Sequence, residues 1–100
     1  MKDFNELEIA VQKWASKRGI DRYDNRFKQY IKFQEEAGEL ARALLKDNDP
    51  EIMDAIGDIT VTLIILADQL GMPFTQCLRV AYDEIKNREG RTENGIFIKD

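Results

Sequence analysis

The chain has 100 residues, of which 43% are hydrophobic and 34% are charged, and its formal net charge is −4. This size and balance predict one soluble globular domain over residues 1–100, and the acidic charge argues against a nucleic-acid backbone as the partner, because that role needs a concentrated basic surface. Histidine is absent, which excludes histidine acid–base catalysis, Ser-His-Asp and Cys-His nucleophiles, and the usual zinc sites.

No secretory or membrane-spanning segment is recognisable in the sequence. The first residues are polar and lack the apolar core of a signal peptide. The apolar run at 59–67 is too short to cross a bilayer and is bounded by Asp58 and Asp68. The single cysteine, Cys77, excludes an intrachain disulfide and is expected in the core. We therefore expect a cytoplasmic protein that does not contact a membrane.

The first predicted helix begins after Asp3, which can cap it, and ends at Gly19. Its apolar residues recur at helical spacing, and Trp14 is the last of them. This pattern is typical of a core or interface residue, with stacking on a nucleobase as the alternative for Trp14. A loop over 20–25 follows.

A second helix is predicted over about 26–46, and it carries three carboxylates within five residues. On a projection of about 100° per residue, Glu36 lies at the border of the apolar face, Glu39 lies further round, and Lys32 shares their side. Glu35 lies closer to solvent. Glu36 is therefore the carboxylate that we expect nearest the core.

The third helix is predicted to begin with Asp49 as its cap and Pro50 in the first turn, and to end near Leu70. It is apolar nearly all round, which indicates a central position in the fold or burial in an oligomer. Asp54 and Asp58 share one side of it. Asp58 lies two turns into the helix, where the preference of the first turn for negative charge no longer explains an acid.

Pro73 is expected to open a fourth helix that ends between Asn87 and Gly90. The tail that follows contains the Asn94-Gly95 pair, which favours a tight turn, and then a short β-prone run. We expect this tail either to form a small hairpin or to pack on a neighbouring subunit.

If the second and third helices pack antiparallel, their acidic stripes converge. Carboxylates held together repel one another and are costly to desolvate unless a cation neutralises them. Because the candidate ligands offer only oxygen, that cation is expected to be Mg²⁺, Mn²⁺ or Ca²⁺. The alternative is that the glutamates form a solvated face, paired with Lys32 and Arg42 along their own helix.

A carboxylate cluster with Mg²⁺ suits phosphoryl or nucleotidyl chemistry, because the metal bridges phosphate oxygens and offsets their charge. Glu35 is the candidate to orient the attacking water or to accept its proton. Basic side chains would hold the remaining phosphates. The candidates for that role are Lys32, Lys86, Arg88, Arg91 and Lys99.

Two segments, Lys32-Phe33-Gln34-Glu35-Glu36-Ala37-Gly38-Glu39-Leu40 and Asp54-Ala55-Ile56-Gly57-Asp58, resemble the signature segments of the MazG-like, all-α nucleoside triphosphate pyrophosphohydrolases, whose pattern is EExxE followed by ExxD. The resemblance extends through Ala67-Asp68-Gln69-Leu70-Gly71 and into the tail at 90–99, and so covers the chain from about Gln12 onward.

The resemblance implies an all-α, four-helix, bundle-like domain with a short extended tail, working as a homodimer or homotetramer with the site near a subunit interface. It implies Mg²⁺-dependent cleavage of a (deoxy)nucleoside triphosphate between the α and β phosphates, giving the monophosphate and pyrophosphate. Glu36, Glu39 and Asp58 carry over as metal ligands, and Glu35 carries over as a metal ligand or a water-orienting base.

One residue departs from the family pattern. The glutamate of ExxD falls at Ala55, which cannot bind a metal. Asp54 is the candidate substitute, although neighbouring residues are separated by about 100° of helix rotation. The runner-up interpretation is therefore a non-catalytic oligomeric helical protein that binds nucleotide or another protein. A di-iron carboxylate bundle is excluded, because its sites use histidine.

Overall fold

The structure, a computed structural model, describes all residues from 1 to 100. It contains four helices followed by a two-stranded hairpin, which confirms the predicted all-α class with a short extended tail. The elements are α1 (Phe4–Lys17), a 3-10 turn η1 (Tyr23–Asn25), α2 (Arg26–Lys46), α3 (Asp49–Gln69), α4 (Phe74–Ile85), β1 (Gly90–Glu93) and β2 (Ile96–Lys99).

The helix ends follow from local capping. Asp3 accepts a hydrogen bond from the Glu6 amide, and the Glu6 side chain accepts one from the Asp3 amide, which forms a capping box at the start of α1. The cap of α3 is Asn48 rather than the predicted Asp49. The side chain of Asn48 accepts the Glu51 amide at 3.2 Å, so Asp49 already lies inside the helix.

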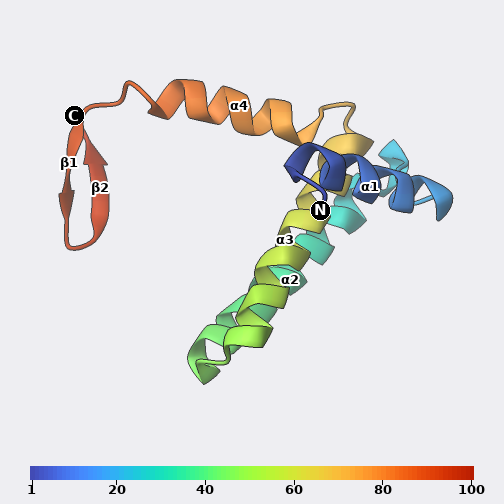
Figure 1. The fold of residues 1–100 in the computed structure, drawn as a ribbon, viewed down its shortest axis with the longest axis horizontal. Coiled ribbons are helices and arrows are strands. Elements are labelled where there is room, and N and C mark those ends of the chain that lie inside the picture. Colours follow the sequence, from blue (N-terminus) through green and yellow to red (C-terminus); the bar gives the residue numbers. More distant parts are fainter.

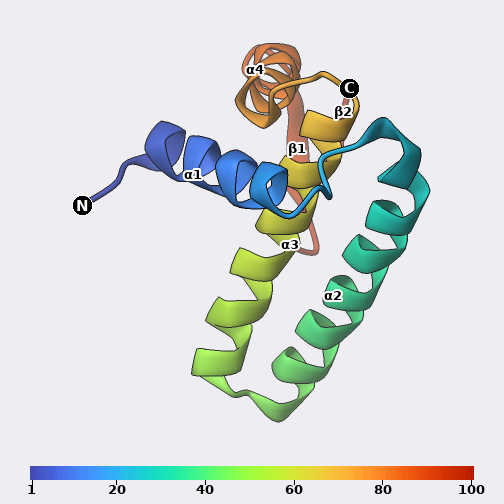
Figure 2. The same ribbon diagram turned by 90° about the vertical axis from the view of Figure 1, so that its right-hand side faces the viewer.

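Helices α2 and α3 form an antiparallel pair joined by a two-residue turn, and α1 crosses α3 near the far end of the pair (Figure 2). The turn begins at Asp47, whose φ of 55° is left-handed and ends α2. Helix α3 packs against α1, α2 and α4. Its predicted central position is confirmed.

Helix α4 leaves the body at the C-terminal end of α3, at an angle of 102° to it, and the hairpin lies beyond its far end (Figure 1). In the hairpin, Gly90 pairs with Lys99 and Glu93 pairs with Ile96. Asn94 and Gly95 both have positive φ, as the tight turn that joins twisted strands requires. The predicted Asn-Gly hairpin is confirmed.

Few side chains are fully covered in one chain. Nine of the 100 residues are buried, and the apolar ones among them are small or lie on α3, such as Ala15, Ala43 and Ile65. Cys77 is exposed, so its predicted place in the core was wrong. The reason is that only Phe74 and Thr75 of α4 are partly covered by the body, and every later residue of the helix is exposed.

No single helix combines the length and the apolar character needed to cross a bilayer; α3 and α4 reach that threshold only as a pair, across the bend between them.

Candidate functional site

The predicted acids of α2 and α3 lie at matching heights on the antiparallel pair. Glu36 lies 10 residues before the end of α2 (46 − 36), and Asp58 lies 9 residues after the start of α3 (58 − 49). Because each residue adds about 1.5 Å along a helix, this nearly equal spacing from the turn places the two residues at nearly the same level. The short turn therefore sets which acids of the two helices face one another.

Glu36 is the most covered of the three α2 carboxylates. Its side chain is 15% exposed, whereas those of Glu35 and Glu39 are 62% and 59% exposed. The prediction that Glu36 lies nearest the core is confirmed. This order follows from the helix projection, on which Glu36 borders the apolar face.

Asp58 is half-buried on α3, and its pKa is raised above the usual 3.8. Burial is the main cause, and the negative charges of Asp54 and Glu36 add to it, while Lys32 acts in the opposite direction. Charges from both helices thus act on one carboxyl group. Glu36, Asp54 and Asp58 therefore lie in one electrostatic neighbourhood on the facing sides of α2 and α3.

Lys32 supplies the positive charge at this cluster. Its Nζ lies 3.3 Å from Glu36 Oε1 and 3.7 Å from Glu35 Oε2, so one ammonium group is shared by two neighbouring carboxylates and balances one of their two charges. Glu39 is paired with Arg42 Nη2 at 2.6 Å along its own helix. For Glu39, this arrangement matches the solvated-face alternative.

The donor set suits a hard divalent cation, because every candidate ligand offers carboxylate oxygen. The pKa of Asp58 is raised first by burial and then by the negative charges of Asp54 and Glu36, so a cation beside it would be favourable. No group of three acidic or cysteine side chains is arranged to coordinate one ion in this conformation. Side-chain rotation of Glu39 away from Arg42 is the simplest adjustment, because both side chains are well exposed.

Ala55 is buried and Asp54 is exposed. The position where the family pattern has glutamate therefore faces the protein interior here, where a charged side chain would be costly. The exposed Asp54 is nevertheless near enough for its negative charge to raise the pKa of Asp58. The structure is compatible with Asp54 as the substitute acid.

A groove of about 430 Å³ adjoins the acidic cluster, and we call it the Trp14 groove. Asp58 forms part of its wall, and Trp14, which is 47% exposed, forms another. The Arg18 guanidinium lies 4.1 Å from the centroid of the Trp14 ring. The lining residues are Leu7, Ala10, Val11, Trp14, Asp58 and Val61.

The sequence did not point to Arg18 as a neighbour of this groove, although its spacing of four residues from Trp14 is the available signal. Nor did the sequence connect Trp14 with Asp58, because the two residues lie on different helices. The packing of α1 across α3 creates that neighbourhood.

The basic residues of the C-terminal part lie elsewhere. Lys86, Arg88 and Arg91 sit at the end of α4 and on the hairpin, which project away from the α2–α3 pair (Figure 1). Each is paired with an acid close in sequence, as in the 3.1 Å contact between Lys86 and Asp83. Within one chain, the structure does not bring them to the acidic cluster.

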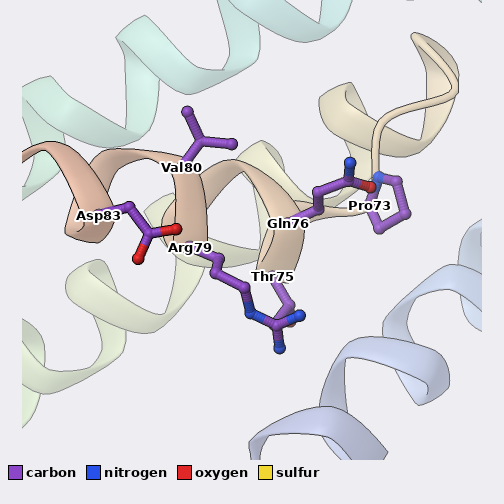
Figure 3. Close-up of a pocket in the computed structure, with 6 residues that line it drawn as sticks. All are labelled: Pro73, Thr75, Gln76, Arg79, Val80 and Asp83. Atoms are coloured by element: carbon purple, nitrogen blue, oxygen red, sulfur yellow. The ribbon is translucent and has the colours of Figure 1, made fainter.

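A second hollow, of about 490 Å³, lies along α4 (Figure 3). Its walls are side chains of α4 and the preceding proline, and no member of the acidic cluster contributes. The lining residues are Pro73, Thr75, Gln76, Arg79, Val80 and Asp83. This hollow is separate from the candidate site.

Comparison with known proteins supports the assignment suggested by the two acidic segments. The model of the MazG-like family matches residues 31–96, a range that contains both segments. An uncharacterized 18.2 kDa protein in the rep-hol intergenic region of Haemophilus phage HP1 (strain HP1c1) is 38% identical over 69 residues. That match covers 69% of this chain but only 42% of the phage protein. No solved structure matches the chain significantly. From the family match, the two motif segments and the helical fold, we conclude that this chain belongs to the MazG-like family.

Proposed function

We propose that the protein is a Mg²⁺-dependent nucleoside triphosphate pyrophosphohydrolase, which cleaves (deoxy)nucleoside triphosphates between the α and β phosphates and serves nucleotide-pool clean-up in the cytoplasm. The observation that supports this proposal is that Glu36 and Asp58 lie on facing helices, where the negative charge of Glu36 adds to burial and to Asp54 in raising the pKa of Asp58. Such a cluster is unfavourable without a cation. Family membership supports the same reaction class.

Glu36, Asp58, Asp54 and Glu39 would hold the metal. When bound, Mg²⁺ neutralises phosphate charge and lowers the pKa of a coordinated water. The protein's own contribution is positional. Two rigid helices hold Glu36 and Asp58 at one level, and the cover over both side chains limits access of bulk water.

Glu35 is suited to orient the attacking water, because its side chain is exposed beside the cluster. Lys32 lies between Glu35 and Glu36 and can turn its ammonium group to a phosphate once a metal neutralises those acids. Lys86, Arg88 and Arg91 would reach a phosphate only from a second copy of the chain.

The Trp14 groove is the candidate position for the nucleobase. It is lined mainly by apolar side chains, it opens beside Asp58, and an indole ring offers a stacking surface to any base. Because an aromatic ring can stack on any base, we expect this groove to accept several nucleoside triphosphates rather than one.

The test is release of pyrophosphate from a panel of ribo- and deoxynucleoside triphosphates, with Mg²⁺ and with a chelator. We expect Mg²⁺-dependent release, and a decrease of about 100-fold or more for Glu36→Gln, with helical content unchanged. Retained activity in this variant would remove Glu36 from the ligand set.

Glu84→Gln is the matched control. Glu84 also pairs with a basic residue four positions away, Arg88, at 3.3 Å, but it lies on α4 far from the cluster. It should leave pyrophosphate release unchanged. An equal loss in both variants would indicate a general effect on the fold.

The second candidate is a non-catalytic protein that binds nucleotide or a protein partner. The burial of Ala55 at the position of a family glutamate favours it, because one ligand of the family pattern is missing. Nucleotide binding by calorimetry without pyrophosphate release from any triphosphate would support this candidate.

A further inference from the structure

Trp14 is the aromatic wall of the Trp14 groove, and nearly half of its side chain is open to solvent, at 47%. An exposed side chain samples several rotamers, and fixing one of them when a ligand binds costs free energy. An indole that another residue already holds in place therefore offers a better stacking surface to a base than an indole that is free to turn.

Arg18 holds the indole of Trp14 through two contacts. Its guanidinium carbon lies 4.1 Å from the centroid of the ring, within the range of a cation–π interaction. Its Nη1 donates a hydrogen bond to the carbonyl oxygen of Trp14 at 3.0 Å. Because the planar guanidinium is tied to the backbone of the same residue whose ring it covers, its position against the ring is well defined.

The end of α1 explains why the Trp14 carbonyl is available to a side chain. The Arg18 amide donates to the Ala15 carbonyl at 3.1 Å and so does not continue the helical pattern to Trp14. Gly19 then leaves the helix with a φ of 69°. The Arg18 side chain takes the place of the amide that would have bonded to Trp14.

The order of residues along α1 separates Arg18 from the groove. Leu7, Val11 and Trp14 share one face of the helix and line the groove. Arg18 continues this face one turn beyond Trp14 and is not part of the lining. Since side chains on a helix lean toward its N-terminus, the Arg18 side chain reaches back to the indole. Along the helix, the ring thus lies between the guanidinium and the rest of the groove.

Arg18 has no acidic partner. Arg42 and Arg88 each pair with a glutamate three or four residues earlier, whereas Arg18 has Trp14 at the corresponding position. None of the ion pairs in the chain includes Arg18. Replacing Arg18 therefore breaks no ion pair, and the effect of the replacement can be assigned to the indole.

We propose that Arg18 is a positioning residue of the nucleotide site, which holds the Trp14 indole as a fixed stacking surface for the base. This inference rests on the proposed nucleotide site and adds to it a residue that acts only through Trp14. Arg18 should therefore affect the affinity for ligands that carry a base. It should affect neither the binding of phosphate groups nor the chemical step.

The first test observes the ring without any ligand. Trp14 is the only tryptophan of the chain, so tryptophan fluorescence reports on this side chain alone. Arg18→Ala should increase quenching by acrylamide and lower the fluorescence anisotropy, because one face of the indole loses its cover. Lys17→Ala is the matched control, since it removes one positive charge from an exposed position in the same turn, and it should leave both signals unchanged. Signals in Arg18→Ala equal to those of the wild type would overturn the proposal.

The second test measures the binding of two probes by calorimetry in the presence of Mg²⁺. One is a deoxynucleoside triphosphate with a methylene group in place of the α–β bridging oxygen, so that this bond is not hydrolysed, and the other is inorganic tripolyphosphate. Arg18→Ala should weaken binding of the nucleotide analogue by about threefold to tenfold and leave binding of tripolyphosphate unchanged. Unchanged binding of both probes, or an equal loss for both, would overturn the proposal, because an equal loss indicates a direct contact with phosphate.

The steady-state kinetics separate this inference from the hydrolase function. Arg18→Ala should raise the KM for a natural triphosphate by the factor found in the binding test and leave kcat unchanged. Binding of the analogue that depends on Arg18, without pyrophosphate release from any natural triphosphate, would support the role of Arg18 and contradict the hydrolase function. Pyrophosphate release with the same KM and kcat in Arg18→Ala and the wild type would support the hydrolase function and overturn the role of Arg18.

Discussion

Asp58 connects packing to the proposed chemistry at the scale of a single residue. Its pKa is above 3.8 in the folded chain, first because of burial and then because of Asp54 and Glu36. The folded state therefore favours the protonated form. At a pH below the pKa of Asp58 in the unfolded chain, the carboxyl is neutral in both states and does not change the free energy of unfolding. As the pH rises toward and through the higher pKa of the folded state, ionisation of this group lowers the free energy of unfolding.

Asp58→Asn removes that pH-dependent cost, so the variant is expected to be more stable than the wild type at pH 7 and nearly equal to it at the acid end. Mg²⁺ should raise the melting temperature of the wild type, because bound cation offsets the same cost, and this rise should be smaller in Asp58→Asn. Thermal melts across pH, with and without Mg²⁺, measure both effects.

Asp68→Asn is the matched control for Asp58→Asn. Asp68 is also a half-buried acid of α3 with a raised pKa, caused by burial and by the charges of Asp21 and Glu8. Its replacement should stabilise the fold at pH 7 in the same way and leave the Mg²⁺ response intact. An unchanged Mg²⁺ response in Asp58→Asn would argue that Asp58 is not a ligand.

At the scale of elements, α4 depends on a cap that comes from α1. Pro73 precedes α4 and offers no side-chain hydrogen bond. Glu8, only 7% exposed, accepts the Thr75 amide at 2.9 Å and the Thr75 hydroxyl at 2.5 Å. A carboxylate at this helix start satisfies a free amide and complements the helix dipole.

Glu8→Gln is therefore expected to destabilise the protein by about 1–2 kcal/mol, because it replaces two charge-assisted hydrogen bonds with weaker neutral ones and removes the negative charge from the start of α4. The same substitution should lower the pKa of Asp68, since Glu8 contributes to its rise. Denaturant unfolding measures the first effect, and a carboxyl titration by NMR measures the second.

Glu89→Gln serves as control for Glu8→Gln. Glu89 is exposed, and its side chain makes no hydrogen bond or ion pair, so its replacement should change stability by less than about 0.5 kcal/mol. A cost no larger than this for Glu8→Gln would mean that Glu8 does not support α4.

The sequence predicted the helices well, because apolar period, caps and turn residues are local signals. It also predicted Glu36 as the covered acid, from helix projection alone. It could not predict the bond from Glu8 to Thr75, which joins residues 67 positions apart, or the neighbourhood of Trp14 and Asp58. Cys77 was misplaced because its exposure depends on the direction in which α4 leaves the body.

At the scale of the whole molecule, a single chain is extended and leaves much apolar surface exposed to solvent. Its radius of gyration is 15.8 Å, against about 13 Å for a compact domain of 100 residues. Large apolar side chains on α2, α3 and α4 remain more than half exposed, among them Phe27, Leu45 and Met53. We therefore propose that assembly supplies part of the stability of the fold.

A chain stabilised by assembly melts at a temperature that depends on its concentration, because association favours only the folded state. We expect the midpoint of thermal unfolding to rise as the protein concentration is raised over about two orders of magnitude. Ile85→Glu places a carboxylate on the exposed apolar side of α4, so it should make the midpoint depend less on protein concentration. If the midpoint of the wild type does not change with protein concentration, folding is not coupled to association of the chains.

The two-residue turn that begins at Asp47 limits how the length of this connection can change in evolution. One added residue there would slide α3 past α2 by about 1.5 Å and rotate it by about 100°, which carries Asp58 away from Glu36 while leaving both helices intact. Loop-length variation, usually harmless in evolution, would here remove the proposed catalytic site while leaving the fold intact. Natural relatives that hydrolyse nucleotides should keep this connection at constant length even where its residues differ.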